Sequence, residues 1–500
     1  MRTLLLIISV LLSGSEQSDK IGHLKELPLI EKPPSKTSKE VIEKGISVTL
    51  NTNMEYLSQT STQKVTLAVK VQANDGPIIL ENRLPVDLVI TADTSHSMVG
   101  EPLALMKESI LFVIKNMEAC DRLALFSFEN YTTNLLDFTP MDAEGKKKAE
   151  QLVKKLIASG GTNIHRAMKI TFDHIKKRKF QNPVTSVLLI SDGLDLYQKS
   201  VEPFRKLAMD FEDYMRSAGD SYRINSFGIS KSHDEKALSV FAKVSGGSFY
   251  YLQKADQLKT AFADSVGQLL SVVGRKAYIA VILDERVSFL EKYGDSWIPP
   301  TVQLVEKITG KSFKSGNLEK VGIIRVELLS AGMSRTYVAD LGITLSEAQI
   351  LNTAAFAFAT STFSFVSSFG SVATNCALGK FVRPTNGEIN GEVEEEGARV
   401  RGGKILNKAR AKALAGDFDG AESELNSFNL ATRMNGALSD SFKNRMDLIF
   451  DPKKISDPKT AEEASMVLNN QQFSLNVPSF AGVNNFVQKK MNAEIVGSTH

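Results

Sequence analysis

The chain has 500 residues, of which 42% are hydrophobic and 23% are charged, a composition typical of a globular protein with roughly two or three domains. Its 60 Lys and Arg residues nearly balance its 57 Asp and Glu residues, and the excess of +3 is scattered, so no nucleic-acid-binding face is indicated. Two cysteines, Cys120 and Cys376, are too few for a zinc or iron–sulfur site, and we expect both to be buried, inert thiols.

The amino terminus has the pattern of a secretory signal peptide. Arg2 precedes an apolar run from Leu4 to Leu12, and the small residues Ser13-Gly14-Ser15 follow. Nine apolar residues span about 14 Å as a helix, less than half of a bilayer core, so a permanent anchor is the weaker interpretation. We therefore expect residues 1–15 to be a signal peptide and 16–43 a linker. The mature protein is expected to be secreted or to reside in the lumen of the secretory pathway, where one disulfide is allowed but not required.

Two regions rich in alternating Val, Thr, Ile and Leu, 44–83 and 274–373, contain no good helix start and predict antiparallel strands. Because the short first region cannot bury its own sheet face, we expect it to combine with the second in one β-sandwich, with the intervening block inserted between them. The uncharged stretch 348–379 resembles a membrane span in length. Its period-two phenylalanines, such as Phe363 and Phe365, instead favour a buried strand pair, so we expect no stable membrane span.

The intervening block, 84–273, alternates apolar strands with amphipathic helices. Strands are predicted at 86–92, 123–128, 184–190, 224–228 and 249–252, and helical periodicity is clearest at 102–117, 163–177 and 254–273. Such alternation is typical of an α/β domain in which helices cover both faces of a parallel sheet.

The chain changes character again near its carboxyl terminus. Turn residues such as Asn386-Gly387 and the acidic run Glu392–Glu396 predict a solvated acidic linker over 374–404, whose charge needs no partner. The region 405–500 is predicted to be a small helical tail, because helical spacing recurs there at 405–414, 421–430 and 438–449.

Polar residues follow the predicted strands of the α/β block at three places. Asp93-Thr94-Ser95-His96-Ser97 comes directly after the first strand, and the loops Gly160–Asn163 and Ser191–Gly193 lie at further strand or loop ends. In an open parallel sheet, ligands bind in the crevice at the carboxyl ends of the strands. We therefore expect five side chains to converge there: Asp93, Ser95, Ser97, Thr162 and Asp192.

This expected set contains only oxygen donors, two carboxylates and three hydroxyls, which suit a hard divalent cation and do not suit zinc or copper. Magnesium fits best, with manganese or calcium as other hard cations. Five protein groups, some acting through water, leave at least one coordination position open. Two negative charges balance the two positive charges of the ion, so an incoming carboxylate meets no excess of anionic ligands. The ion would then be a docking point for a protein partner with an exposed carboxylate.

With these residues, the block resembles a von Willebrand factor type A domain carrying the metal-ion-dependent adhesion site. The family motif is D-x-S-x-S, then Thr in a G-T-N-type loop, then an Asp beginning D-G, and the set named above matches it in order over about 190 residues. This sequence departs from the family motif at His96, where the family usually has Gly. The imidazole is expected to affect the affinity for the metal more than the identity of the ligands. The resemblance implies a Rossmann-like fold and metal-dependent, adhesion-type protein binding. The flanking strands also resemble, in architecture only, secreted members such as the inter-alpha-trypsin inhibitor heavy chains.

Other interpretations of these motifs are weaker. Thr162 could cap the helix that begins near Asn163, but separate helix caps do not explain complementary groups on three loops. A hydrolase is the main rival because Ser95-His96-Ser97 places hydroxyls beside an imidazole. Adjacent residues after a strand point apart, however, and no G-x-S-x-G elbow precedes a helix, so we expect no enzyme. Gly310-Lys311-Ser312 resembles the end of a phosphate loop, but Val305 stands where the first Gly must be.

Two further motifs are expected at the surface. The basic run 176–179 ends a predicted helix, where its charges are expected to face water and complement the helix dipole. Asn130-Tyr131-Thr132 fits a glycosylation acceptor just past a strand, so a glycan on Asn130 is predicted for a secreted chain.

The sequence thus predicts a secreted, non-enzymatic protein that binds an acidic group of a partner through a bound magnesium ion. The alternative is a secreted structural or scaffold module whose metal site is vestigial or only stabilising. Metal-dependent stability without metal-dependent capture would favour this alternative. The identity of the partner and the oligomeric state are left open.

Overall fold

The computed structural model describes residues 45–449 and 479–480, apart from 55–61, 76–82, 230–232, 253–257, 295, 347–354, 368–369 and 383–388. The expected signal peptide (1–15), the linker (16–43) and the tail beyond 449, except for the short strand β16 (Ser479–Phe480), lie outside these residues. Within the described part of the chain, no helix is both long and apolar enough to cross a membrane.

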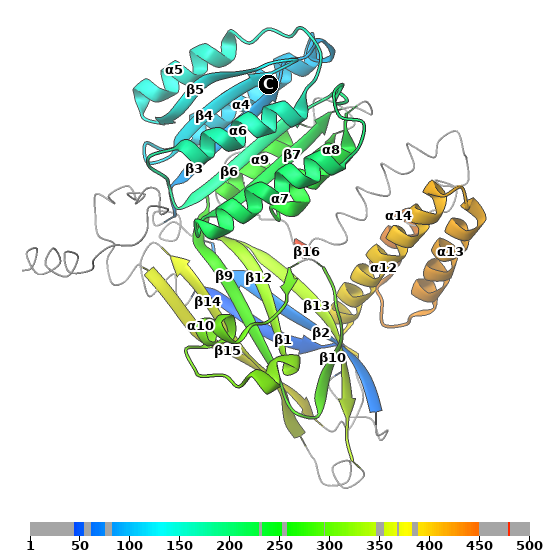
Figure 1. Cartoon of the computed structure of the whole chain (residues 1–500). Helices are drawn as coiled ribbons and strands as arrows, with labels where there is room; N and C mark the ends of the chain where they lie inside the picture. The colour runs from blue at the N-terminus through cyan, green and yellow to red at the C-terminus, as the bar shows by residue number, and fades with distance from the viewer. Residues whose placement is uncertain are drawn as a thin grey trace, which may run out of the picture.

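A six-stranded sheet covered by helices forms the α/β unit at one end of the molecule (Figure 1). Its strands, in sheet order, are β5 (Thr132–Pro140), β4 (Arg122–Phe128), β3 (Val86–Asp93), β6 (Val184–Ser191), β7 (Ser221–Ile229) and β8 (Phe249–Leu252). Its helices are α4 (Glu101–Asn116), α5 (Ala143–Lys154), α6 (Ile164–Lys177), α7 (Glu202–Ser217), α8 (Glu235–Val244) and α9 (Leu258–Leu269), with a 3-10 turn η1 (His96–Met98). The predicted α/β architecture is confirmed.

The sheet is mixed, whereas the strand and helix alternation predicted a parallel one. Strands β3, β4, β6, β7 and β8 run parallel, but β5 pairs with β4 in the antiparallel sense. The physical reason is the connection: only residues 129–131 join β4 to β5, and a connection this short can join only antiparallel neighbours.

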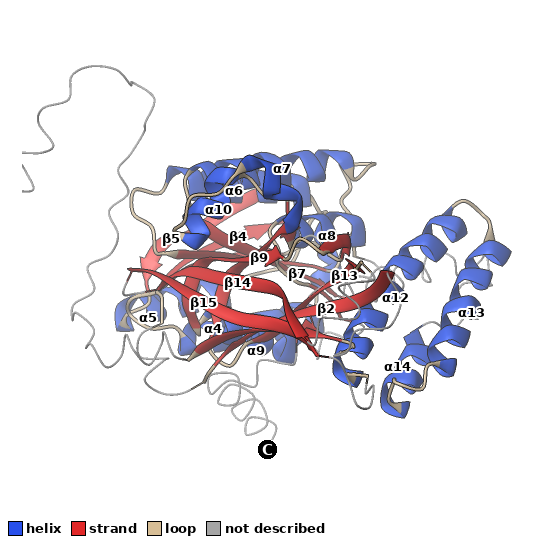
Figure 2. Ribbon diagram, turned by 90° about the horizontal axis from the view of Figure 1, so that it is seen from below, coloured by secondary structure: helices blue, strands red, loops and turns tan. Residues whose placement is uncertain are grey.

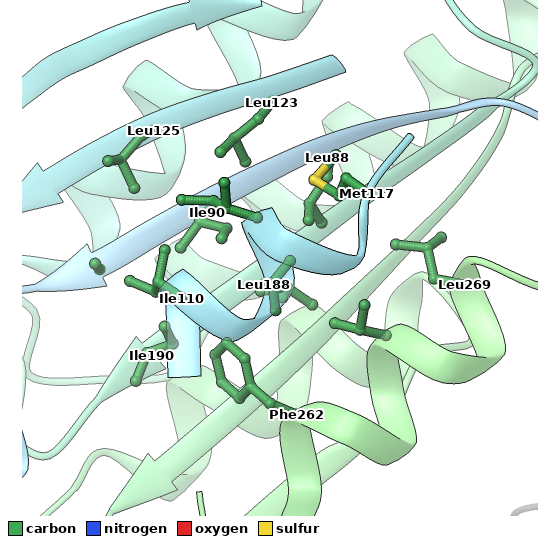
Figure 3. Close-up of a cluster of buried hydrophobic side chains, with 14 of the residues drawn as sticks. Leu88, Ile90, Ile110, Met117, Leu123, Leu125, Leu188, Ile190, Phe262 and Leu269 are labelled. Carbon is green, nitrogen blue, oxygen red and sulfur yellow. The ribbon is translucent and has the colours of Figure 1, made fainter. Parts of the chain in front are cut away.

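Side chains of the central strands alternate between two apolar cores, one on each face of the sheet. Leu88 and Ile90 of β3 belong to the core formed with α4, α5 and α9, which also contains Ile110 and Phe262 (Figure 3). Val89 belongs to the opposite core, formed with α6, α7 and α8. Strand β3 is buried along its whole length, which explains its unbroken apolar run.

Two antiparallel sheets form the second body of the molecule. The first has the order β1-β2-β13-β10, with β16 beside β13, and the second has the order β11-β12-β9-β14-β15. Their bounds are β1 (Ile46–Thr52), β2 (Thr62–Ala73), β9 (Val272–Leu283), β10 (Val287–Lys292), β11 (Trp297–Ile298), β12 (Val321–Ser330), β13 (Ser334–Thr344), β14 (Ala355–Ser367) and β15 (Gly370–Val382). One apolar core contains residues of both sheets, including Val69, Leu341, Ile279 and Phe363. The strand pair expected around Phe363 and Phe365 is confirmed by the pairing of β14 with β15.

The α/β unit lies between strands that pair with each other. Strand β2, which precedes it in sequence, pairs with β13, which follows it, from Gln72 opposite Ser334 to Thr62 opposite Thr344. The chain enters and leaves the unit at one place, where Leu84 N–H donates to Val272 C=O at 2.6 Å. The unit is therefore an insertion with adjacent ends.

The basic run at the end of α6 differs from its expected exposed position, because Arg178 is buried. Its guanidinium donates to Asp87 Oδ2 at 2.9 Å and to Thr185 Oγ1 at 2.7 Å, and it lies 3.5 Å from Asp220. Asp87 is itself completely buried beneath the amino ends of the strands and also pairs with Arg122. A buried carboxylate requires such partners, so Arg178 is drawn inward while Lys177 and Lys179 stay exposed.

The expected acidic linker over 374–404 is wrong. This segment contains the end of β15 and the beginning of α12 (Gly391–Leu414), which is capped by the Asn390 side chain. The acidic residues stand in the first turns, where carboxylates favour the helix dipole, and they have partners: Glu394 accepts from Asn53 at 2.8 Å, and Glu392 pairs with Lys70 at 2.7 Å.

Helix α12 connects the sheets to a helical hairpin with α13 (Phe418–Met434) and α14 (Asp440–Ile449). These helices lie beside the sheets (Figure 2). Arg401 of α12 donates to Thr66 Oγ1 at 3.2 Å and lies 3.4 Å from the buried Asp340. On the other side of the molecule, α10 (Val302–Thr309) and the 3-10 segment η3 (Ser315–Lys320) pack on the second sheet.

Cys120 is exposed in the turn before β4, not buried as expected, and its thiol is free. The turn places it next to Asp121, which is buried and accepts from Arg83, so the acid rather than the thiol takes the inward position. The side chain of Cys376 lies outside the described residues.

Candidate functional site

Two of the predicted loops meet through direct hydrogen bonds at the carboxyl ends of β3 and β6. Ser97 Oγ donates to Asp192 Oδ1 at 2.6 Å, and Ser95 Oγ lies 3.0 Å from Ser97 Oγ. Asp93, at the end of β3, accepts a hydrogen bond from Ser191, the last residue of β6. The strands therefore bring the two carboxylates, which are 99 positions apart in sequence, to one edge of the sheet.

The third loop reaches the same cluster through Thr162. A side-chain carbon placed on Gly193 would lie 2.7 Å from Thr162 Oγ1 and 3.5 Å from Ser97 Oγ. Gly193 therefore leaves the space that these hydroxyls share, and a larger residue would fill it. The structure brings together all five residues that the sequence predicted: Asp93, Ser95, Ser97, Thr162 and Asp192.

Backbone hydrogen bonds fix the first loop. Asp93 Oδ1 accepts from its neighbour Ser95 N at 2.8 Å, which is the local turn that an Asp side chain favours. His96 N donates to Gly160 C=O at 3.0 Å, and Ser159 N donates to Thr94 C=O at 2.8 Å. The first loop is thus held against the loop that carries Thr162. The side chain of His96 is exposed, so its imidazole lies at the surface of the cluster rather than among the oxygen atoms.

Sequence reasoning missed Asp195, which positions the loop after β6. Its carboxylate is buried and accepts from His165 N at 3.0 Å, in the first turn of α6, and from Tyr197 N at 2.8 Å. It therefore joins the loop that carries Asp192 to the start of the helix that follows Thr162. No local pattern revealed this role, because the helix that Asp195 contacts lies 30 residues away in sequence.

The cluster is electrostatically unfavourable when both acids are ionised. Burial raises the pKa of Asp93 to about 7, although hydrogen bonds from Ser191 and Ser95 oppose the shift, and the charge of Asp192 adds to it. Burial also raises the pKa of Asp192, against the hydrogen bond from Ser97. None of the main causes of the two pKa shifts is a cationic side chain.

The donors present could hold a hard divalent cation. Carboxylate and hydroxyl oxygens are suitable ligands, Ser97 is exposed to solvent, and a cation would offset the charge of two buried carboxylates. No group of three or more Asp, Glu, His or Cys side chains with metal-binding geometry occurs in the described part of the chain. A cation at this position would consequently depend on the Ser and Thr hydroxyls as well as on Asp93 and Asp192.

Asn130, the predicted glycosylation acceptor, lies in the turn between β4 and β5 near the same cluster. It is half-buried, and its Oδ1 accepts from the Tyr197 hydroxyl at 3.0 Å. A side-chain carbon on Gly161 would lie 2.6 Å from this oxygen. The acceptor thus stands beside the loop of Thr162, and its glycosylation remains a prediction.

The fold and the loops define the class of this domain: a family model for the von Willebrand factor type A domain matches residues 86–251. These residues form a von Willebrand factor type A domain, as the motif resemblance predicted. A solved von Willebrand factor type A protein from Catenulispora acidiphila has the same fold, with a TM-score of 0.58 at 14% identity, covering 87% of this chain and 97% of that one.

Relatives with known names share only part of the chain. The uncharacterized protein sll0103 of Synechocystis is 24% identical over 222 residues, which are 44% of this chain and 49% of that protein. The E3 ubiquitin-protein ligase WAV3 of Arabidopsis thaliana is 32% identical over 112 residues, or 22% and 15% of the two chains. Inter-alpha-trypsin inhibitor heavy chain H4 of Bos taurus is 24% identical over 116 residues, or 22% and 12%. The chain thus spans about half of the first relative and less of the others.

Proposed function

We propose that this chain is a secreted or lumenal, non-enzymatic binding protein whose von Willebrand factor type A domain captures a protein partner through a hard divalent cation. Magnesium is the first choice, with manganese or calcium as substitutes. The observation that carries the proposal is the convergence of Asp93, Ser97, Thr162 and Asp192 from three loops at the carboxyl edge of the sheet.

Each residue of the cluster has a separate task in this proposal. Asp93 and Asp192 would supply the charge that holds the cation, and Ser95, Ser97 and Thr162 would supply neutral oxygens, so that the bound ion keeps affinity for one more anionic ligand. When bound, the cation supplies an electrophilic point that accepts a carboxylate oxygen of the partner. Ser191 and the backbone N–H of Ser95 orient the Asp93 carboxylate by hydrogen bonds.

The same geometry argues against a hydrolase. Ser95 and Ser97 bond to each other, and Ser97 donates to Asp192, so neither hydroxyl is aimed at an imidazole. The rings of His165 and His174 pack against the rings of Phe204 and Phe138. The ligase activity in the name of WAV3 belongs to that protein, and the match covers 15% of it.

The test compares the wild type with Asp93→Ala and with the control Asp210→Ala, which alters an exposed acid on α7. Magnesium is expected to raise the thermal midpoint of the wild type and of the control, and to have no effect on Asp93→Ala. Proteins captured from extracellular material should be recovered in magnesium and lost in chelator. Capture that is unchanged in chelator would reject the proposal.

A second candidate is a structural module in which the cation only stabilises the domain. It is favoured by the complete burial of Asp93, because a buried carboxylate gains stability from any bound cation whether or not a partner follows. Magnesium-dependent stability in the absence of any magnesium-dependent capture would support this candidate over the first.

A further inference from the structure

Large apolar side chains are exposed around the oxygen cluster. Among the described residues, twelve large hydrophobic side chains are exposed, and five of them lie on the segments that form or border the site. These five, here called the collar, are Val99, Tyr131, Leu194, Leu196 and Tyr197, each between 52% and 66% exposed. Such a concentration at one edge of one domain marks an interaction surface better than scattered single residues do.

Contacts with the site loops hold the collar in place. Leu196 N donates to Thr162 C=O at 3.0 Å, and a side-chain carbon on Gly161 would lie 2.8 Å from Leu196 Cδ1. The Tyr197 hydroxyl donates to Asn130, and the Tyr131 ring lies 5.2 Å from the Arg166 guanidinium carbon. These side chains are anchored at their backbones or tips while their apolar surfaces face solvent, so little ordering is needed when a partner covers them.

Val99 is the collar residue on the first loop of the site. This residue directly follows the turn η1, which carries Ser97, and Leu194 follows Asp192 by two positions. The loop that carries Ser97 and the loop that carries Asp192 therefore each present an exposed apolar side chain two positions beyond the site residue. A ligand whose carboxylate reaches Ser97 and Asp192 would bring its neighbouring groups close to these apolar side chains.

We infer that the partner presents a single Asp or Glu flanked by large apolar side chains in an exposed peptide segment. This inference rests on the proposed function, since the carboxylate would dock on the cation. Charge complementarity favours this ligand over a polyanion such as an acidic polysaccharide, because a polyanion needs several cationic side chains and the collar residues are uncharged. Burying the collar against apolar groups of the ligand is favourable by about 25 cal/mol per Å² of apolar surface.

The experiment uses a library of short displayed peptides with one fixed Asp and random flanking positions, selected on the immobilised full chain in magnesium and eluted with chelator. The wild type is expected to enrich Leu, Ile, Phe, Tyr or Trp beside the Asp. The variant Leu194→Ser/Leu196→Ser, with both substitutions on the exposed surface, should lose this enrichment and bind the selected peptides at least about tenfold more weakly. Met434→Ser, an exposed apolar residue on α13, is the matched control and should behave as the wild type.

The outcomes separate this inference from the proposed function. The inference about the collar would be overturned if the chelator-eluted peptides had polar or basic flanks. It would also be overturned if the Leu194→Ser/Leu196→Ser variant selected the same apolar flanks as the wild type. Neither result would contradict the cation-dependent capture. Absence of any chelator-eluted peptide from the wild type, together with no magnesium effect on its thermal midpoint, would overturn both. Self-association of the chain through the collar, seen as a magnesium-dependent dimer lost in the double variant, would also overturn the inference of a peptide partner.

Discussion

Asp93 combines two properties that usually exclude each other, because it is completely buried and it is acidic. Hydrogen bonds from Ser95 and Ser191 lower the cost of its charge but do not remove it, and its pKa stays near 7. The residue therefore makes the stability of the cation-free domain depend on pH.

The direction of this dependence follows from proton linkage. The pKa of Asp93 is about 7 in the folded protein and 3.8 in the reference state, so the folded state binds more protons between these values. The free energy of unfolding in chelator should consequently fall as pH rises from about 4 to about 7, by up to about 1.4 kcal/mol per pH unit. Asp93→Asn keeps the shape of the side chain and should flatten this profile. Urea unfolding across that range measures it, and an unchanged profile in the variant would contradict the assignment to Asp93.

The acceptor Asn130 makes a second prediction at the scale of single residues. Thr132→Ala removes the glycosylation motif but retains Asn130 and its hydrogen bond from Tyr197. Among the described residues, the buried Thr132 hydroxyl has no hydrogen-bond partner, so its removal should cost little stability. In protein made by a secretory host, the variant should lose the mass of one glycan and capture more partner in magnesium, because the sugar would stand beside the collar. Equal masses for wild type and variant would contradict the glycan.

At the scale of helices and strands, local sequence patterns predict some features of the structure and not others. The central strands and the helices α4 and α6 are predictable because strand burial and helical periodicity are local signals, and the ligand motif is predictable because its residues follow strand ends. The roles of β5, Asp195 and Arg178 are not predictable from local patterns. The direction of β5 depends on a turn too short for a crossover, and Asp195 and Arg178 depend on partners that are distant in sequence. The acidic beginning of α12 has the local pattern of a linker, because its partners, Asn53 and Lys70, lie more than 300 residues away in sequence.

The network beneath the strands gives a prediction at this scale. Arg178→Met should lower the free energy of unfolding by about 3 kcal/mol, because it leaves the buried Asp87 with one cationic partner fewer. Lys179→Met, the exposed neighbour in the same basic run, is the matched control and should change stability by less than about 0.5 kcal/mol. Chemical denaturation measures both. Similar losses in the two variants would show that Arg178 has no special role.

At the scale of the whole molecule, the protein consists of bodies with distinct apolar cores, joined where Val272 of β9 and Leu328 of β12 extend the core covered by α4, α5 and α9. The α/β unit has one core on each face of its sheet, and the paired antiparallel sheets have their own. Trp297, the one tryptophan in the sequence, packs against the core of the antiparallel sheets and donates to Val338 C=O at 3.0 Å. Its fluorescence therefore reports on the sheets and not on the domain with the candidate cation site.

This arrangement predicts that magnesium affects the two bodies differently. Magnesium should raise the urea midpoint measured by hydrogen exchange of strand β6, and it should leave the midpoint of Trp297 emission unchanged. In Asp93→Ala, neither midpoint should respond. A magnesium shift of the same size in both probes would show that the bodies unfold as one unit.

The tethering of the α/β unit at Leu84 and Val272 determines how the molecule would meet a large target. Strand β3 starts next to this tether and runs eight residues, about 25 Å, before Asp93 ends it. The strand thus acts as a spacer that places the candidate cation site at the end of the unit opposite the tether to the antiparallel sheets. A bulky target could approach from that end without colliding with the sheets or the helical hairpin.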